Sequence, residues 1–174
     1  QKKQLTASWT NGNGSSRLVF MKQTNSGASS PVNGTTYSAN TTFGSGTQIG
    51  ESGWFCVYKG NGNSVTVTNL TQGTEYMINV IEFNGNTGTE LYNTNSATAN
   101  PLNVTTISVP VITWSNPSDI TYGTLLSTTQ YNPTTSVPGA YVYNPAINTK
   151  LNVGDHQMLI SSFTPTNLSL YSIV

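Results

Sequence analysis

The sequence predicts an all-β protein made of two tandem β-sandwiches, on three observations. First, 28 threonines, 21 asparagines and 20 serines stand among its 174 residues, a mixture that favours strands and turns over helices. Second, apolar and polar residues alternate along short stretches, most clearly at residues 65–67 and 76–83, as is typical of half-buried strands. Third, Asn-Gly pairs such as Asn61-Gly62 separate these stretches, as tight turns between strands would.

Charge is sparse and balanced, with six Lys or Arg and six Asp or Glu residues and a net charge of zero. The cations are scattered, so the sequence lacks the basic stripe that binds nucleic acid. No apolar run approaches the roughly 20 residues that cross a bilayer, and the first residues are not a signal peptide. We therefore expect no nucleic-acid partner and no membrane span in this chain, with any targeting segment lying outside it.

Three stretches open the first predicted sandwich. Residues 5–9 alternate between apolar and polar side chains and run into Asn-Gly-Asn-Gly at residues 11–14, a tight-turn sequence. Residues 17–22 then form the return strand. The long stretch 23–63 that follows includes the aromatic and β-branched residues 54–59, so we expect extra strands there and not a disordered loop.

A corner follows the strand at residues 65–67. Leu70 is expected to plug the core, and Gly73 supplies a permissive backbone. Tyr76 comes three residues later, where its ring can pack inside while its hydroxyl reaches back to a carbonyl of the corner. Further along, residues 90–99 are expected to form the last strand of this sandwich.

Four stretches of the first half match the pattern of one domain family in the correct order. They are residues 5–22, 33–40, 43–50 and 70–76. Together they resemble the fibronectin type III-like domains of large secreted and surface proteins of Bacteroidetes-type bacteria, and the corner resembles the tyrosine corner of immunoglobulin-like sandwiches. The resemblance implies a sandwich that starts almost at its strand B. We therefore expect strand A to be missing, and to be supplied by a longer polypeptide or by a neighbouring subunit.

The second half has a different pattern, in three stretches. Residues 112–127, 137–145 and 163–166 resemble, in order, the signature of short bacterial immunoglobulin-like repeats that occur in tandem on large surface proteins. Apolar residues between 151 and 160 would supply the intervening strands. A segment of small β-forming residues between two prolines precedes this half and is interpreted as a linker. The predicted organisation is a fibronectin type III-like β-sandwich at 1–100, a linker at 101–110 and a bacterial immunoglobulin-like β-sandwich at 111–174.

No constellation of residues points to catalysis or to a bound metal. His156 is the only histidine and stands beside Asp155 at an expected turn, and the sequence has no G-x-S-x-G motif. The single cysteine, Cys56, lies among aromatic and β-branched residues, which favours a buried thiol over a reactive one. Three carboxylates on or beside the corner strand are best interpreted as edge or loop residues: Glu75, Glu82 and Glu90. We therefore predict no catalytic residue, no metal and no cofactor.

Aromatic residues in and near the inserted region allow two interpretations. If they face outward, they could stack on sugars as in carbohydrate-binding modules. If they face inward, they fill a core that a small domain needs. The candidate stacking residues are Trp54, Tyr58, Tyr37 and Phe43.

The predicted function is that of a non-enzymatic extracellular module of a bacterial protein, acting as a stalk, spacer or surface adhesin. Because an exposed strand edge recruits a further strand, self-assembly into a filament extends this prediction. The alternative is a carbohydrate-binding accessory module of a secreted polysaccharide-degrading enzyme. The expected partners are neighbouring domains or other copies of the same protein, and glycans of the cell surface or the environment. The expected location is the cell surface or the exterior, which suits the polar, uncharged composition.

Overall fold

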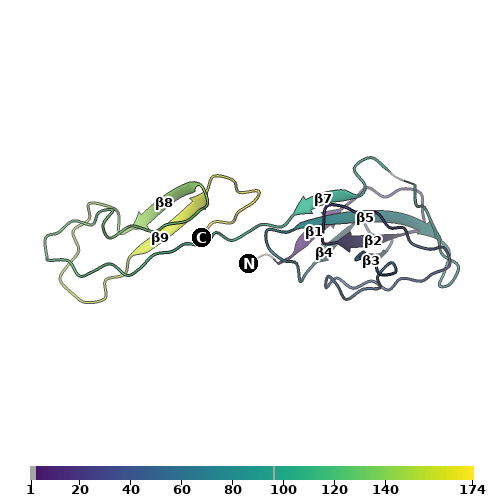
Figure 1. Cartoon of the computed structure of the whole chain (residues 1–174), viewed down its shortest axis with the longest axis horizontal. Helices are drawn as coiled ribbons and strands as arrows, with labels where there is room; N and C mark the ends of the chain where they lie inside the picture. Colours follow the sequence, from purple (N-terminus) through teal and green to yellow (C-terminus); the bar gives the residue numbers. More distant parts are fainter. Residues whose placement is uncertain (1–2, 96) are drawn as a thin grey trace. The chain divides into compact units, whose positions relative to one another are not determined.

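The computed structural model describes residues 3–95 and 97–174. It contains nine β-strands and, within those residues, no helix, so the prediction of an all-β fold is confirmed. The same part of the chain therefore holds no helix long and apolar enough to cross a membrane. The chain divides into two compact units, Gln1–Thr106 (unit 1) and Ile107–Val174 (unit 2), and Figure 1 shows the strands of each.

Unit 1 contains a small antiparallel sheet of two strands. Strand β1 (Leu5–Ser8) pairs with β4 (Ser64–Val67), with Leu5 opposite Val67 and Ala7 opposite Val65. Alternation along each strand puts these four apolar side chains on one face, as the sequence pattern predicts. That face packs on the larger sheet of unit 1.

Five strands form the larger sheet: β2 (Ser16–Lys22), β3 (Phe55–Gly60), β5 (Glu75–Asn84), β6 (Leu91–Tyr92) and β7 (Leu102–Thr105). Strand β2 lies between β3 and β5, while β6 and β7 pair with opposite ends of β5. Between β6 and β7, the Asn100 side chain forms the hydrogen bonds to β5 that a neighbouring strand would form. Its Nδ2 donates to the Val80 carbonyl at 2.7 Å, and its Oδ1 accepts from the Val80 N–H at 3.0 Å.

Both faces of the larger sheet are buried, which explains the unbroken apolar run at residues 18–21 of β2. One cluster lies between the two sheets and contains Val19, Met21, Val57, Val65, Val67, Leu70, Tyr76 and Ile78. The other covers the opposite face and contains Leu18, Phe20, Tyr37, Ile49, Trp54, Cys56, Ile81, Phe83 and Tyr92. Unit 1 is therefore a two-sheet sandwich with a second core on its outer side.

Within the stretch 23–63, the strand expected at residues 54–59 forms as β3, so this prediction is confirmed. The stretch 23–54 contains no strand and forms the outer cover. Its backbone is anchored along β3, where Cys56 N–H donates to the Thr47 carbonyl at 2.9 Å and the Cys56 carbonyl accepts from Asn40 N–H at 3.1 Å. Glycine-rich turns interrupt the stretch too often for strands to extend. Tyr37 and Trp54 of this stretch cover the sheet instead.

The end of unit 1 also differs from the prediction. The strand expected at residues 90–99 is limited to β6, and the next strand, β7, lies inside the predicted linker. Residues 102–105 alternate and find a pairing partner in the first half of β5, with Thr105 opposite Glu75. Unit 1 ends at Thr106, one residue after β7.

Unit 2 is built on one antiparallel hairpin of β8 (Gly139–Asn144) and β9 (Ile160–Pro165). Val174 extends the pairing on the far side of β9. The Phe163 N–H donates to the Val174 carbonyl at 2.6 Å, and the Phe163 carbonyl accepts from the Val174 N–H at 3.1 Å. The remaining described residues of the unit form turns and isolated bridges. The strands expected between residues 151 and 160 do not form, apart from Ile160 itself.

Five aromatic rings run through the centre of unit 2. Successive ring centroids lie 5.8 Å apart for Trp114 and Tyr131, 4.3 Å for Tyr131 and Tyr143, 6.1 Å for Tyr143 and Tyr141, and 4.8 Å for Tyr141 and Phe163. Tyr131 and Phe163 are buried. Offset stacking and edge contacts of this kind add to the stabilisation from burial, so the aromatic chain is the core of this small unit.

Candidate functional site

The corner between β4 and β5 brings its three predicted residues together. Leu70 and Tyr76 are buried between the sheets, and Gly73 has a φ of 61°, which a glycine adopts readily. The Tyr76 hydroxyl accepts a hydrogen bond from the Thr71 N–H at 2.9 Å. The partner is thus a backbone amide and not the carbonyl that the sequence analysis expected.

Thr106 is a corner residue that the sequence analysis missed, because it lies in the segment interpreted as a linker. Its hydroxyl donates to the Thr71 carbonyl at 2.5 Å and accepts from the Thr74 N–H at 3.0 Å. Its carbonyl accepts from the Gly73 N–H at 3.1 Å. The corner is therefore closed by the last residue of unit 1, and its contacts are structural.

The four candidate stacking aromatics do not form a platform. Trp54 and Tyr37 are buried in the cluster on the outer face of the larger sheet, and Trp54 Nε1 donates to the Gly27 carbonyl at 3.1 Å. Phe43 and Tyr58 pack against the other cluster, between the sheets. Two pairs on opposite faces of one sheet cannot bind the same sugar. Of the two interpretations, these positions favour the one in which the rings pack in the cores.

Glu82 holds the turn at residues 11–14. It accepts from the Arg17 guanidinium at 2.9 Å and from the Gly12 N–H at 2.7 Å, and it also accepts from the Gly14 N–H. Burial acts to raise the pKa of Glu82, but the hydrogen bonds from Arg17, Gly12 and Gly14 outweigh it and lower the pKa below its ordinary value. A side chain at Gly14 would collide with this carboxylate, so the turn and Glu82 are fitted to each other.

Glu90 has the same role in a second loop. It is fully buried and accepts from the Thr36 hydroxyl at 2.6 Å, the Gly88 N–H at 2.8 Å and the Lys59 ammonium at 3.2 Å. The Thr36 hydrogen bond, helped by Lys59 and Gly88, lowers the pKa of Glu90 to about 2. Glu82 and Glu90 are therefore ionised framework carboxylates with all their partners in unit 1.

The other two titratable candidates, Cys56 and His156, differ in their burial. Burial raises the pKa of the Cys56 thiol to about 12, so the reactive thiolate does not form at neutral pH. His156 stands in a turn with a φ of 54° and is exposed beside Asp155. Across residues 3–95 and 97–174, no three His, Cys, Asp or Glu side chains lie together as a metal would need.

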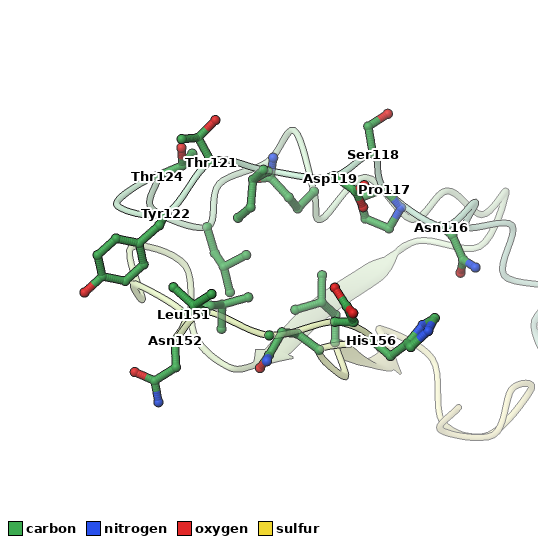
Figure 2. Close-up of a pocket in the computed structure, with 18 of the residues that line it drawn as sticks. Asn116, Pro117, Ser118, Asp119, Thr121, Tyr122, Thr124, Leu151, Asn152 and His156 are labelled. Carbon is green, nitrogen blue, oxygen red and sulfur yellow. The ribbon is translucent and has the colours of Figure 1, made fainter.

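Unit 2 contains a cavity of about 800 Å³ that the sequence analysis did not anticipate. Residues 116–124 line one side and residues 151–157 line the other, with Trp114 and Gln130 at its margin. Figure 2 shows these two segments facing each other, with Thr121 and Asn152 pointing away from the space between them. The lining contains both polar and apolar residues, and the apolar ones include Ile120, Leu126, Leu151, Val153 and Leu159.

Two aromatic residues stand at this cavity. Tyr122 is 64% exposed, and the Lys150 ammonium lies 5.3 Å from its ring centroid. Trp114 donates its Nε1–H to the Gln130 carbonyl at 3.0 Å, which fixes the indole. A lining of polar and apolar residues suits a ligand that has both hydrogen-bonding groups and an apolar face.

Comparison of the chain with models of known protein families, with curated proteins and with solved structures found no match.

Proposed function

We propose that this chain is a non-enzymatic structural module of an extracellular protein, serving as a stalk, spacer or surface adhesin. The observation that supports it best is the use of charge in unit 1. Arg17 and Glu82 form an ion pair between β2 and β5, and Lys59 and Glu90 form one that fastens a loop to the larger sheet. Hydrogen bonds from backbone and side-chain donors satisfy both carboxylates inside the framework. The charged side chains thus stiffen the scaffold, as a load-bearing module requires.

The fold proposal is a tandem of immunoglobulin-like units, the first of the fibronectin type III kind. In unit 1, β1 and β4 pack over β2, β3 and β5, and a buried tyrosine closes the corner between β4 and β5. Sandwiches of this class have two antiparallel sheets and such a corner. For unit 2 the support is the aromatic hairpin of β8 and β9, which includes two of the sequence stretches that resemble bacterial immunoglobulin-like repeats.

A second candidate function is a carbohydrate-binding accessory module of a secreted polysaccharide-degrading enzyme. The cavity of unit 2 favours it, since Tyr122 presents an exposed ring there. The sugar would bind at this cavity and not at the aromatic residues of unit 1, which pack in the cores of that unit.

Retention on insoluble polysaccharides separates the two candidates. The structural module is expected to elute with an inert control protein. Retention that Tyr122→Ala abolishes would favour the accessory module instead, because that variant removes the exposed ring without touching a core. The matched control is Leu168→Ala, which truncates another exposed side chain of unit 2 outside the cavity lining.

A further inference from the structure

We propose that the free edge of β1 pairs with the free edge of β8 from a second copy of this chain, which joins copies head to tail. This inference rests on the proposed structural function and names the surfaces through which such a module would assemble. It follows from three observations: which backbone groups β1 leaves unpaired, how its side chains are buried, and what β8 offers in return.

One edge of β1 has no partner strand among the described residues, where β1 pairs with β4 alone. The Trp9 N–H donates to the Asn63 carbonyl on the β4 side at 3.0 Å. In an antiparallel pair, hydrogen-bonded positions alternate along the strand. Leu5 and Ala7 therefore also turn their backbone groups toward β4, and Thr6 and Ser8 turn theirs outward.

Side-chain burial differs between the two strands of the small sheet. The core-facing valines of β4, Val65 and Val67, are 7% and 1% exposed. On β1, the core-facing residues Leu5 and Ala7 are only partly buried, and so is Trp9, which follows the strand. Trp9 Nε1 is a buried donor without an acceptor in the described structure, a rare condition for a native polar group. A strand beside β1 would cover these residues.

Strand β8 has a matching free edge. The Thr166 N–H donates to the Pro138 carbonyl at 2.9 Å, on the side of the hairpin partner, so even-numbered residues of β8 face β9 and Tyr141 and Tyr143 face away. Those outward groups have no backbone partner in the described part of unit 2. Val142 is 68% exposed on the other side of the hairpin from the aromatic rings.

The alternation fixes which side chains would meet. If β1 and β8 pair antiparallel with Ser8 opposite Tyr141 and Thr6 opposite Tyr143, their outward backbone groups form the hydrogen bonds. Ala7 then lies opposite Val142. The exposed valine joins the half-buried row of Leu5, Ala7 and Trp9, so one contact covers both apolar surfaces.

Charged residues and prolines, which block many natural edges, are missing from both strands, β1 and β8. The two edges belong to different parts of the chain, so the contact is heterologous. Each added copy brings one further β1 edge and one further β8 edge, so the contact can repeat from copy to copy.

Sedimentation velocity of the full chain over a wide concentration range tests the proposal. The wild-type chain is expected to form a concentration-dependent series of oligomers. Ser8→Pro removes an outward N–H, and Val142→Lys places a charge in the contact; each is expected to weaken association at least about tenfold. Val32→Lys, at a 61% exposed site in the loop of unit 1, is the matched control and should associate like the wild type.

A double variant tests the register itself. Ala7→Cys with Val142→Cys is expected to give disulfide-linked oligomers under oxidising conditions, because directly opposite residues lie within disulfide range. Ser8→Cys with Val142→Cys places the thiols on opposite faces and should not crosslink. A wild-type chain that stays monomeric, or oligomers unaffected by both Ser8→Pro and Val142→Lys, would overturn the edge contact. Neither result would contradict the proposed structural function, because that proposal is tested separately by the location of the protein on cells.

Discussion

Leu70→Ala is expected to lower the free energy of unfolding of unit 1 by about 2 to 5 kcal/mol, the range for truncating a buried leucine. Leu70 is 2% exposed and packs between the two sheets at the corner. Its removal leaves a cavity beside the ring of Tyr76, which the Thr71 hydrogen bond holds in place. Denaturant unfolding followed by the fluorescence of Trp54 measures the change.

Leu91→Ala is the control for this prediction. It removes the same atoms from a residue that is 63% exposed on β6, so it should change the free energy of unfolding by less than about 0.5 kcal/mol. Equal effects of the two variants would contradict the assignment of Leu70 as the plug of the corner.

Tyr131→Ala is expected to destabilise unit 2 by about 3 to 5 kcal/mol, as truncation of a buried aromatic ring does. Tyr131 is 2% exposed and lies in the middle of the aromatic chain, stacked 4.3 Å from Tyr143. Its hydroxyl also donates to the Pro145 carbonyl at 2.6 Å. The fluorescence of Trp114, at one end of the chain of rings, reports the unfolding of this unit.

Tyr131→Phe separates the ring from the hydroxyl. It keeps the stacking and loses one hydrogen bond, so a cost of about 0.5 to 1.5 kcal/mol is expected. If Tyr131→Ala costs no more than Tyr131→Phe, the aromatic chain is not the core of unit 2. Each alanine variant should also leave the unfolding of the other unit unchanged, because the chain divides into two compact units.

The fold class and the corner could be predicted from sequence because both depend on local patterns. Alternation fixed the faces of β4 and β5, and the spacing from Leu70 to Tyr76 indicated the corner. The position of Trp54 and Tyr37 could not be predicted in the same way. An aromatic residue in a loop has the same local sequence whether it faces solvent or covers a sheet, and here both rings cover β2 and its neighbours.

Long-range pairing explains the other differences. Residues 102–105 resemble a linker beside Pro101, yet they form β7 because the first half of β5 has an open side. Thr106 closes the corner through hydrogen bonds to Thr71 and Thr74, which precede it by 35 and 32 residues. The cavity of unit 2 was missed for the same reason, since its two sides come from segments that only the folded chain brings together.

The location of the protein on cells tests the proposed extracellular structural function most directly. Antibodies raised against the 174-residue chain are applied to intact and to lysed cells of the source organism, before and after a protease treatment that leaves the cells intact. We expect labelling of intact cells that the protease removes, or the chain in the culture medium. Labelling that appears only after lysis and survives the protease treatment would contradict the account.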